Sequence, residues 1–179
     1  PVLRRATLDA IEFEIATLEG RRRCWFDESF RQSEDIELWT RIAATTSWRI
    51  EGVPEPLTLY RVHTAALSSN TAAQLETWYR FRAKIESIAP DLIARSGARS
   101  EAYQLRYLAR RSAMNGNGGE ACRLAARSLW LHPRLALEEP ARTVQTFAFA
   151  CTAAALPADA FDAARTAAFG WRRSATSAI

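Results

Sequence analysis

Two neighbouring acids, Glu34 and Asp35, are the residues of this sequence best suited to chemistry. They follow Ser33 in the stretch "SEDIELWTRIAA". An ionised carboxylate can take the proton of a hydroxyl group, which is otherwise a poor nucleophile near neutral pH. Acids in the first turn of a helix also have a structural role, because they offset the partial positive charge of the helix N-terminus. Taken alone, the acidic pair therefore favours helix stabilisation over catalysis.

The element that positions these acids is a helix predicted over residues 33–45. Ser33 is a residue type favoured at helix N-caps. Apolar side chains recur at helical spacing, so the helix has one face suited to burial. The residues of that face are Leu38, Trp39, Ile42 and Ala43.

The rest of the first 70 residues mixes short elements. The opening "PVLRRATLDAI" begins as a short strand and becomes helical, and "CWFDESF" is a loop with aromatic anchors. Farther along, "SWRIEGVPEPLTLYRVH" contains two short β-like runs that glycine and proline separate. After residue 70 the pattern is almost wholly helical. Helices are predicted over residues 72–89, 100–114, 120–131, 141–156 and 158–171.

A helical hairpin is predicted in the middle of this second part, where "NGNGG" (115–119) separates two helices. The spacing of its small residues looks like one degenerate unit of the tetratricopeptide type. Those residues are Ala109, Ala113, Gly118, Ala121 and Ala125, with Pro133 after them. Because stable arrays need about three such units, we interpret the segment as a helical extension.

The basic balance of the chain does not predict nucleic-acid binding, which stays a weak alternative. The net charge is +4, but the arginines are scattered among acids and alanines, and Lys84 is the only lysine. The three cysteines show no CxxC spacing, so neither a disulfide framework nor a zinc cluster is expected, and a reducing cytosol fits. The longest nearly uncharged apolar run, residues 144–156, is shorter than the roughly 20 residues that span a bilayer.

Several motifs around the acidic pair occur together and in order. They are "FDESF", "SEDIELWTRIA", "W-x-I-E-G-V-P-E-P-L-T-L-Y-R-V-H" and "A-L-S-S-N". This ordered set resembles the C-terminal half of the catalytic domain of family 2 glycosyltransferases, over about residues 1–70. The resemblance implies a GT-A fold and an inverting transfer of a sugar from a nucleotide-sugar donor to an acceptor hydroxyl. It also implies that Asp35 is the general base and that Glu34 supports or orients the acceptor side.

The same resemblance suggests roles for four further residues. Trp39 and Arg41 match "LW-x-R" and are candidates for substrate or phosphate binding. The alternatives are that Trp39 belongs to the core and that Arg41 pairs with Glu37 or Glu34, and for Arg41 we favour the structural role. Arg61 is a candidate for the donor phosphates through its bidentate fork. His63 matches a position that helps to hold the metal in some relatives and lies in a mobile flap in others.

The chain departs from the family pattern in two ways. It has no D-x-D, so the family's nucleotide-binding half, which holds most of the Mg²⁺ or Mn²⁺ site, is not found in it. We therefore expect these residues to be inactive alone; if the chain is part of an enzyme, the native sequence should continue upstream of Pro1 with the half that carries D-x-D. In addition, "DAIEFEIATLEGRRRCW" is longer than the usual connection. We expect it to form an extra helix with Arg21–Arg23 at its end.

These observations predict a predominantly helical α+β chain. Residues 1–70 would form part of a GT-A half, with a few short strands around the acidic helix, and residues 71–179 an all-α helical-hairpin extension. The resemblance points to bacterial polysaccharide or cell-surface glycan assembly in the cytoplasm. There the acceptor is a glycan or is lipid-linked, and peripheral contact with the inner membrane is expected. The alternative is a non-catalytic helical protein-interaction module.

Overall fold

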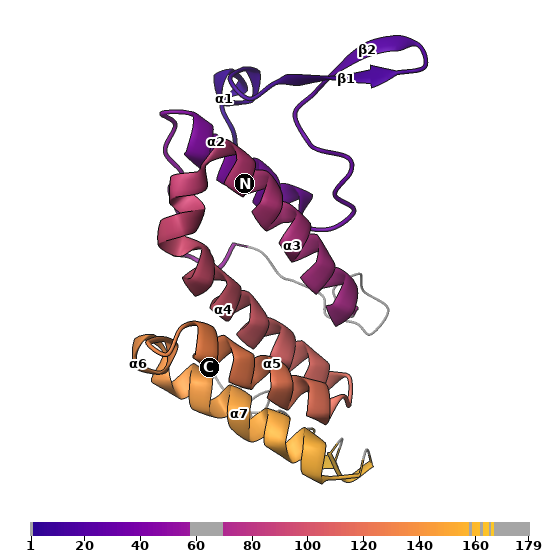
Figure 1. Ribbon diagram of the computed structural model, residues 1–179, viewed down its shortest axis with the longest axis vertical. Coiled ribbons are helices and arrows are strands. Elements are labelled where there is room, and N and C mark those ends of the chain that lie inside the picture. The colour runs from indigo at the N-terminus through magenta and orange to yellow at the C-terminus, as the bar shows by residue number, and fades with distance from the viewer. Residues whose placement is uncertain (1, 58–69, 158, 162, 165, 167–179) are drawn as a thin grey trace. The chain divides into compact units, whose positions relative to one another are not determined.

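A computed structural model describes residues 2–57, 70–157, 159–161, 163, 164 and 166. Within these residues helices predominate, and one two-stranded antiparallel sheet accompanies them (Figure 1). The prediction of a predominantly helical α+β chain is confirmed at this level. The elements are α1 (Arg5–Asp9), β1 (Phe13–Thr17), β2 (Gly20–Cys24), α2 (Glu34–Thr45), α3 (Thr71–Ile88), α4 (Pro90–Met114), α5 (Gly118–Leu131), α6 (Leu135–Glu138) and α7 (Pro140–Ala155).

The chain forms two compact units, Pro1–Gly97 and Ala98–Ile179, so the division falls within α4. Helix α3 packs against α2 and therefore belongs to the first unit. The boundary predicted near residue 70, where the sequence pattern becomes almost wholly helical and the family resemblance ends, stays a prediction.

A β-hairpin, not the expected extra helix, occupies the segment between α1 and the "FDESF" loop (Figure 1). Strands β1 and β2 pair in antiparallel register from Phe13↔Cys24 to Thr17↔Gly20. The turn is short, and Gly20 has a φ of 128°, a conformation that glycine adopts without steric cost. Arg21–Arg23 therefore lie along β2, and not at a helix end. Arg21 and Arg23 pair with the acids Glu14 and Glu12 at 3.1 Å each.

Helix α2 matches the predicted range and carries the core of the first unit. Its buried residues Leu38 and Ile42 pack against Ile11, with further apolar residues around them. These surrounding residues are Leu3, Leu8, Trp39 and Trp48. Ser33 occupies the N-cap position, but its φ is 61° and its side chain makes no capping hydrogen bond. The expected side-chain cap is therefore absent, and the backbone N–H of Glu37 donates to the Ser33 carbonyl at 3.0 Å.

Two other local expectations were wrong. Residues 2–4 precede α1 without forming a strand, and residues 46–57 contain none of the expected β structure. Glycine and prolines between residues 52 and 56 remove the regular pairing positions that a strand needs. Most of the second β-like run lies outside the described residues.

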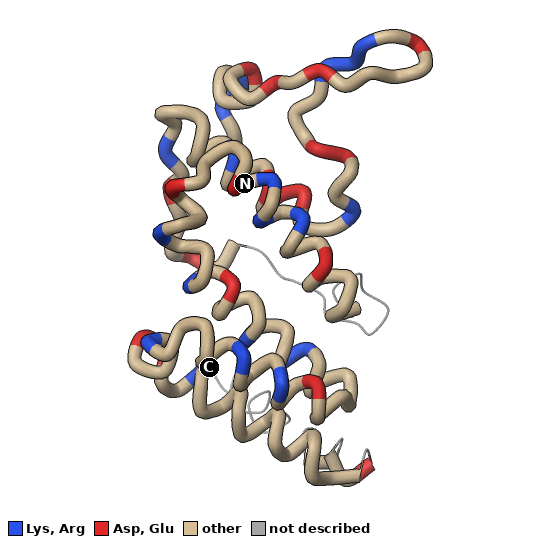
Figure 2. Tube along the Cα trace, in the orientation of Figure 1, with Lys and Arg blue, Asp and Glu red and all other residues tan. Residues whose placement is uncertain are grey.

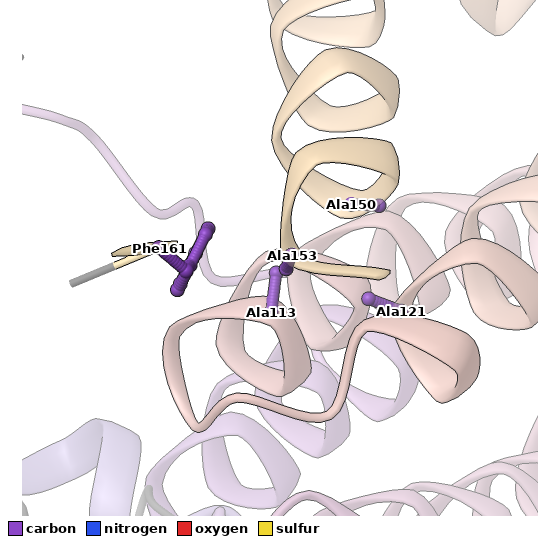
Figure 3. Packing of buried hydrophobic residues seen from close by; sticks show 5 residues of the cluster. All are labelled: Ala113, Ala121, Ala150, Ala153 and Phe161. Carbon is purple, nitrogen blue, oxygen red and sulfur yellow. The ribbon is translucent and has the colours of Figure 1, made fainter. Parts of the chain in front are cut away.

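In the second unit, the helices pack against one another mainly through alanine side chains. Buried Ala113 on α4, Ala121 on α5 and Ala150 on α7 form one cluster (Figure 3). Ala153 and Phe161 complete it. Helices α4 and α5 flank the predicted "NGNGG" break, and an ion pair between Arg127 and Glu101 at 2.8 Å joins them. The predicted helical hairpin is therefore confirmed.

The start of α4 differs from the sequence prediction. The helix begins at Pro90, directly after α3, and not at residue 100. Proline is well suited to the first turn of a helix, because its missing N–H would be unpaired there in any case. Pro90 thus separates α3 from α4 and also starts α4. The described residues 159–161, 163, 164 and 166 are also helical, within the last predicted helix.

Candidate functional site

Glu34 and Asp35 form the first turn of α2, and both side chains are exposed. One carboxylate oxygen of Asp35, Oδ1, accepts a hydrogen bond from the backbone N–H of Ile36 at 2.8 Å. The helix start therefore holds this carboxylate by a main-chain contact while leaving the side chain open to solvent. Such a group can meet an incoming hydroxyl, because nothing has to be displaced from a buried ion pair.

The third acid of the motif, Glu37, has the opposite environment. Its side chain is fully buried and pairs with Arg41 one turn later on α2. Arg41 Nε donates to Glu37 Oε1 at 2.8 Å and Nη2 donates to Oε2 at 3.2 Å. The remaining guanidinium donors reach main-chain carbonyls, of Ile11 at 2.7 Å and of Trp25.

Arg41 thus joins α2 to both ends of the β-hairpin, because Ile11 precedes β1 and Trp25 follows β2. These internal acceptors support the structural alternative for Arg41 over phosphate binding. The sequence left open whether Arg41 pairs with Glu37 or with Glu34, and in the structure it pairs with Glu37.

Lys84 from α3 completes a set of four charged residues that we name the charge cluster: Asp27, Glu37, Arg41 and Lys84. Its Nζ lies 2.7 Å from Asp27 Oδ2 and 2.8 Å from Glu37 Oε1. Burial raises the pKa of Asp27, but hydrogen bonds from Lys84 and Ser29 outweigh it and bring the pKa to about 2. The aspartate of "FDESF", Asp27, is therefore ionised and held in an ion pair, which makes it a structural group in this conformation.

Aromatic rings surround the charge cluster. The Arg41 guanidinium lies 5.1 Å from the centroid of the Phe13 ring, and Lys84 Nζ lies 5.8 Å from it. Lys84 Nζ also lies 5.6 Å from the Phe30 ring. These distances fall within the range of cation–π attraction. Sequence reasoning did not identify Lys84 or Phe13 as members of this group. The one available signal was that Lys84 is the only lysine of the chain.

Trp39 is half-buried and borders a groove of about 830 Å³ in the first unit. The groove runs between α1, α2 and the segment from Trp48 to Leu57. Its lining is largely apolar, and Ile50 and Val53 remain exposed within it. Trp39 follows Asp35 by four residues, so the two lie one turn apart on the same side of α2. Trp39 therefore contributes to the core, as the alternative held, and also to a surface next to Asp35.

The resemblance implies a divalent cation held mainly by residues that this chain lacks, so few of its ligands are expected in the described part of the chain. No group of three or more His, Cys, Asp or Glu residues that could hold a metal occurs there. Arg61 and His63 lie outside the described residues, so their predicted roles remain predictions. The described residues thus offer no set of ligands for the divalent cation, and no step of the proposed reaction depends on it.

Comparisons with protein-family models, with curated proteins and with solved structures find no match to this chain. None of the helices in the described residues is long and apolar enough to cross a membrane. Basic and acidic residues are interspersed along the described trace (Figure 2).

Proposed function

We propose that the N-terminal part of this chain is the acceptor side of a glycosyltransferase. The enzyme would move a sugar from a nucleotide-sugar donor to a hydroxyl of a glycan or lipid-linked acceptor. The observation that carries the proposal is the contrast among the acids of the motif block. Asp27 and Glu37 are engaged in the charge cluster, whereas Glu34 and Asp35 are exposed at the start of α2.

In the proposed reaction Asp35 accepts the proton of the acceptor hydroxyl. The hydroxyl oxygen attacks the anomeric carbon, and the bond from that carbon to the donor phosphate breaks with its electron pair going to the diphosphate. Glu34 contacts or orients the acceptor. General base catalysis of this kind typically contributes a factor of about 10²–10⁴ to the rate.

The groove beside Trp39 supports this assignment because Trp39, which lines it, follows Asp35 by one helical turn, so we propose the groove as the place of the acceptor. Aromatic faces and aliphatic side chains suit the apolar face of a sugar ring or a lipid chain. Groups that bind the donor nucleotide and stabilise the leaving diphosphate must come from outside the described residues. We propose the cytoplasmic side of a bacterial inner membrane as the place of this activity, as the family resemblance implies.

The proposal is tested in the native polypeptide that contains this chain. Sugar transfer from a panel of nucleotide-sugar donors is measured by product mass and by release of nucleoside diphosphate. The expected result is donor-dependent transfer that Asp35→Asn removes while the circular dichroism spectrum is unchanged. Undiminished transfer by Asp35→Asn would exclude the base assignment, and an absence of transfer with every donor would exclude the enzyme.

One observation supports the alternative of a protein-interaction module. Among the described residues of the second unit, the most exposed large apolar side chains are Trp130, Leu137 and Val144, at 80%, 83% and 68% of their surface. Exposed aromatic residues of this kind are frequent at binding surfaces. On this alternative the native polypeptide transfers no sugar, and Trp130→Ala weakens a complex that chemical crosslinking detects in cells.

A further inference from the structure

Two of the three cysteines lie close together on the facing helices α5 and α7. Cys122 follows Ala121, and Cys151 follows Ala150, and these two alanines belong to one buried cluster (Figure 3). The Cys122 side chain packs on the same cluster, and the Cys151 thiol is near enough to contribute to the raised pKa of Cys122. Both cysteines are unpaired thiols in the structure.

The backbones of these helices approach unusually closely, which is the condition that a covalent link would need. A Cβ at Gly118 would overlap main-chain atoms of Ala153 and Ala154. The two main chains are therefore in direct contact at Gly118, and a disulfide needs Cα atoms about 4.4–6.8 Å apart. Cys122 lies one turn after Gly118, and Cys151 lies about one turn before Ala154. Cys122 and Cys151 thus lie on two closely packed helices, each next to an alanine of the shared buried cluster.

We propose that Cys122 and Cys151 form a reversible disulfide that links α5 to α7 when a peroxide oxidises the protein. The inference is independent of the proposed transferase activity. The disulfide would be a redox modification site in the second unit.

The chemistry proceeds in two steps. The Cys151 thiol loses its proton, and the thiolate attacks one peroxide oxygen; the O–O bond breaks, which gives a sulfenic acid and a hydroxide that takes up that proton as water. The Cys122 sulfur then attacks the Cys151 sulfur, the S–S bond forms, and hydroxide leaves and takes up the proton of Cys122 as water. Two thiols are oxidised and one peroxide is reduced to two waters. A dithiol reductant reverses the change by thiol–disulfide exchange.

The difference in exposure decides which of the two sulfurs reacts with the peroxide first. Cys151 is exposed and meets the oxidant first, whereas Cys122 is partly buried. Burial, and after it the neighbouring Cys151 thiol, raises the pKa of Cys122. A raised pKa disfavours direct attack of Cys122 on peroxide and suits it to the second step. Cys24 is 5% exposed in the first unit and should remain a thiol.

The test oxidises the reduced full chain with hydrogen peroxide and maps the thiols by mass spectrometry. The expected result is a loss of two of the three thiols, with the peptides of Cys122 and Cys151 joined in a monomer that dithiothreitol restores. Because the fold holds the pair together, the link should form at least about tenfold faster in native protein than in urea. The matched control Cys24→Ser should lose the same two thiols, and Cys122→Ser should form no internal link.

Three outcomes would overturn the inference. They are a link that involves Cys24, dimers joined through Cys151 in place of the internal link, and equal rates of linkage in native and urea-unfolded chains. The comparison of native with unfolded wild-type protein needs no variant, so misfolding of a serine variant does not affect it.

Discussion

The ammonium group of Lys84 lies 2.8 Å from the fully buried carboxylate of Glu37. The contact joins α3 to α2 through residues far apart in the sequence, and it lies beside the bidentate pair between Glu37 and Arg41. A buried carboxylate is costly unless cations compensate it. The acidic helix therefore depends on α3 for its stability, although α3 lies in the part that the sequence assigned to the extension.

We expect Lys84→Met to destabilise the first unit by about 2 kcal/mol, because Glu37 then keeps one cation in place of two. Urea unfolding followed by tryptophan fluorescence measures the change. Arg80→Met is the matched control, since Arg80 is exposed on the same helix and its contacts to Ser29 lie at the surface. The control should change the free energy of unfolding by less than about 1 kcal/mol. Equal effects of both variants would contradict a stabilising charge cluster.

Acid should weaken the first unit through Asp27. Its folded pKa of about 2 lies below the value of 3.8 for the free side chain. The ionised group therefore contributes stability above about pH 4, of about 1–2 kcal/mol after solvent screening, and loses it as the pH falls toward 2. Asp27→Asn should flatten this acid dependence of the unfolding midpoint. Asp9→Asn, at an exposed pair with Arg5, should leave it unchanged, and a flat wild-type profile would contradict the account.

Gly118→Ala should destabilise the second unit by about 1–3 kcal/mol, because the new methyl group overlaps the backbone of α7. The next residue provides the control, since a Cβ at Gly119 meets no atom within 4 Å. Gly119→Ala should be neutral or stabilising by up to about 1 kcal/mol. Calorimetry of both variants checks the pair, and equal melting temperatures would show that α5 and α7 do not approach through position 118.

If the acceptor binds in the groove beside Trp39, a polar substitution in the groove lining should weaken acceptor binding. Val53 is 64% exposed in the groove lining, so Val53→Asp changes its polarity without cutting into the core. In the native polypeptide we expect the KM for an apolar acceptor to rise by about tenfold, the equivalent of about 1.4 kcal/mol of lost binding. The KM for the donor should stay constant. Leu18→Asp, at the exposed hairpin turn, is the control, and a rise in donor KM alone would contradict an acceptor groove.

The sequence was informative where the determinants are local. Spacing of apolar residues predicted α2, and "NGNGG" predicted the break between α4 and α5. The β-hairpin was missed because "EFEIATLEGRRR" contains good helix formers. Alternating burial along β1 is a weak signal in a strand of five residues.

The same distinction between local and long-range determinants applies to the candidate site. Asp35 was identified from ordered motifs, and its exposure could not be derived from them. The partner of Asp27 could not be predicted, because Lys84 lies 57 residues away and pairs only after α3 packs on α2. The roles of Arg61 and His63 remain predictions.

The measurement that tests the central claim most directly compares Asp35→Asn with Asp91→Asn in the native polypeptide. Asp91 occupies the second position of α4, as Asp35 does in α2, and both are exposed, so the two substitutions change helix stability alike. The account predicts that kcat for sugar transfer falls by about 10²–10⁴ in Asp35→Asn. Asp91→Asn should keep wild-type kcat, and both variants should melt at similar temperatures. A kcat of Asp35→Asn equal to that of Asp91→Asn would contradict the account and leave the acidic pair with a structural role alone.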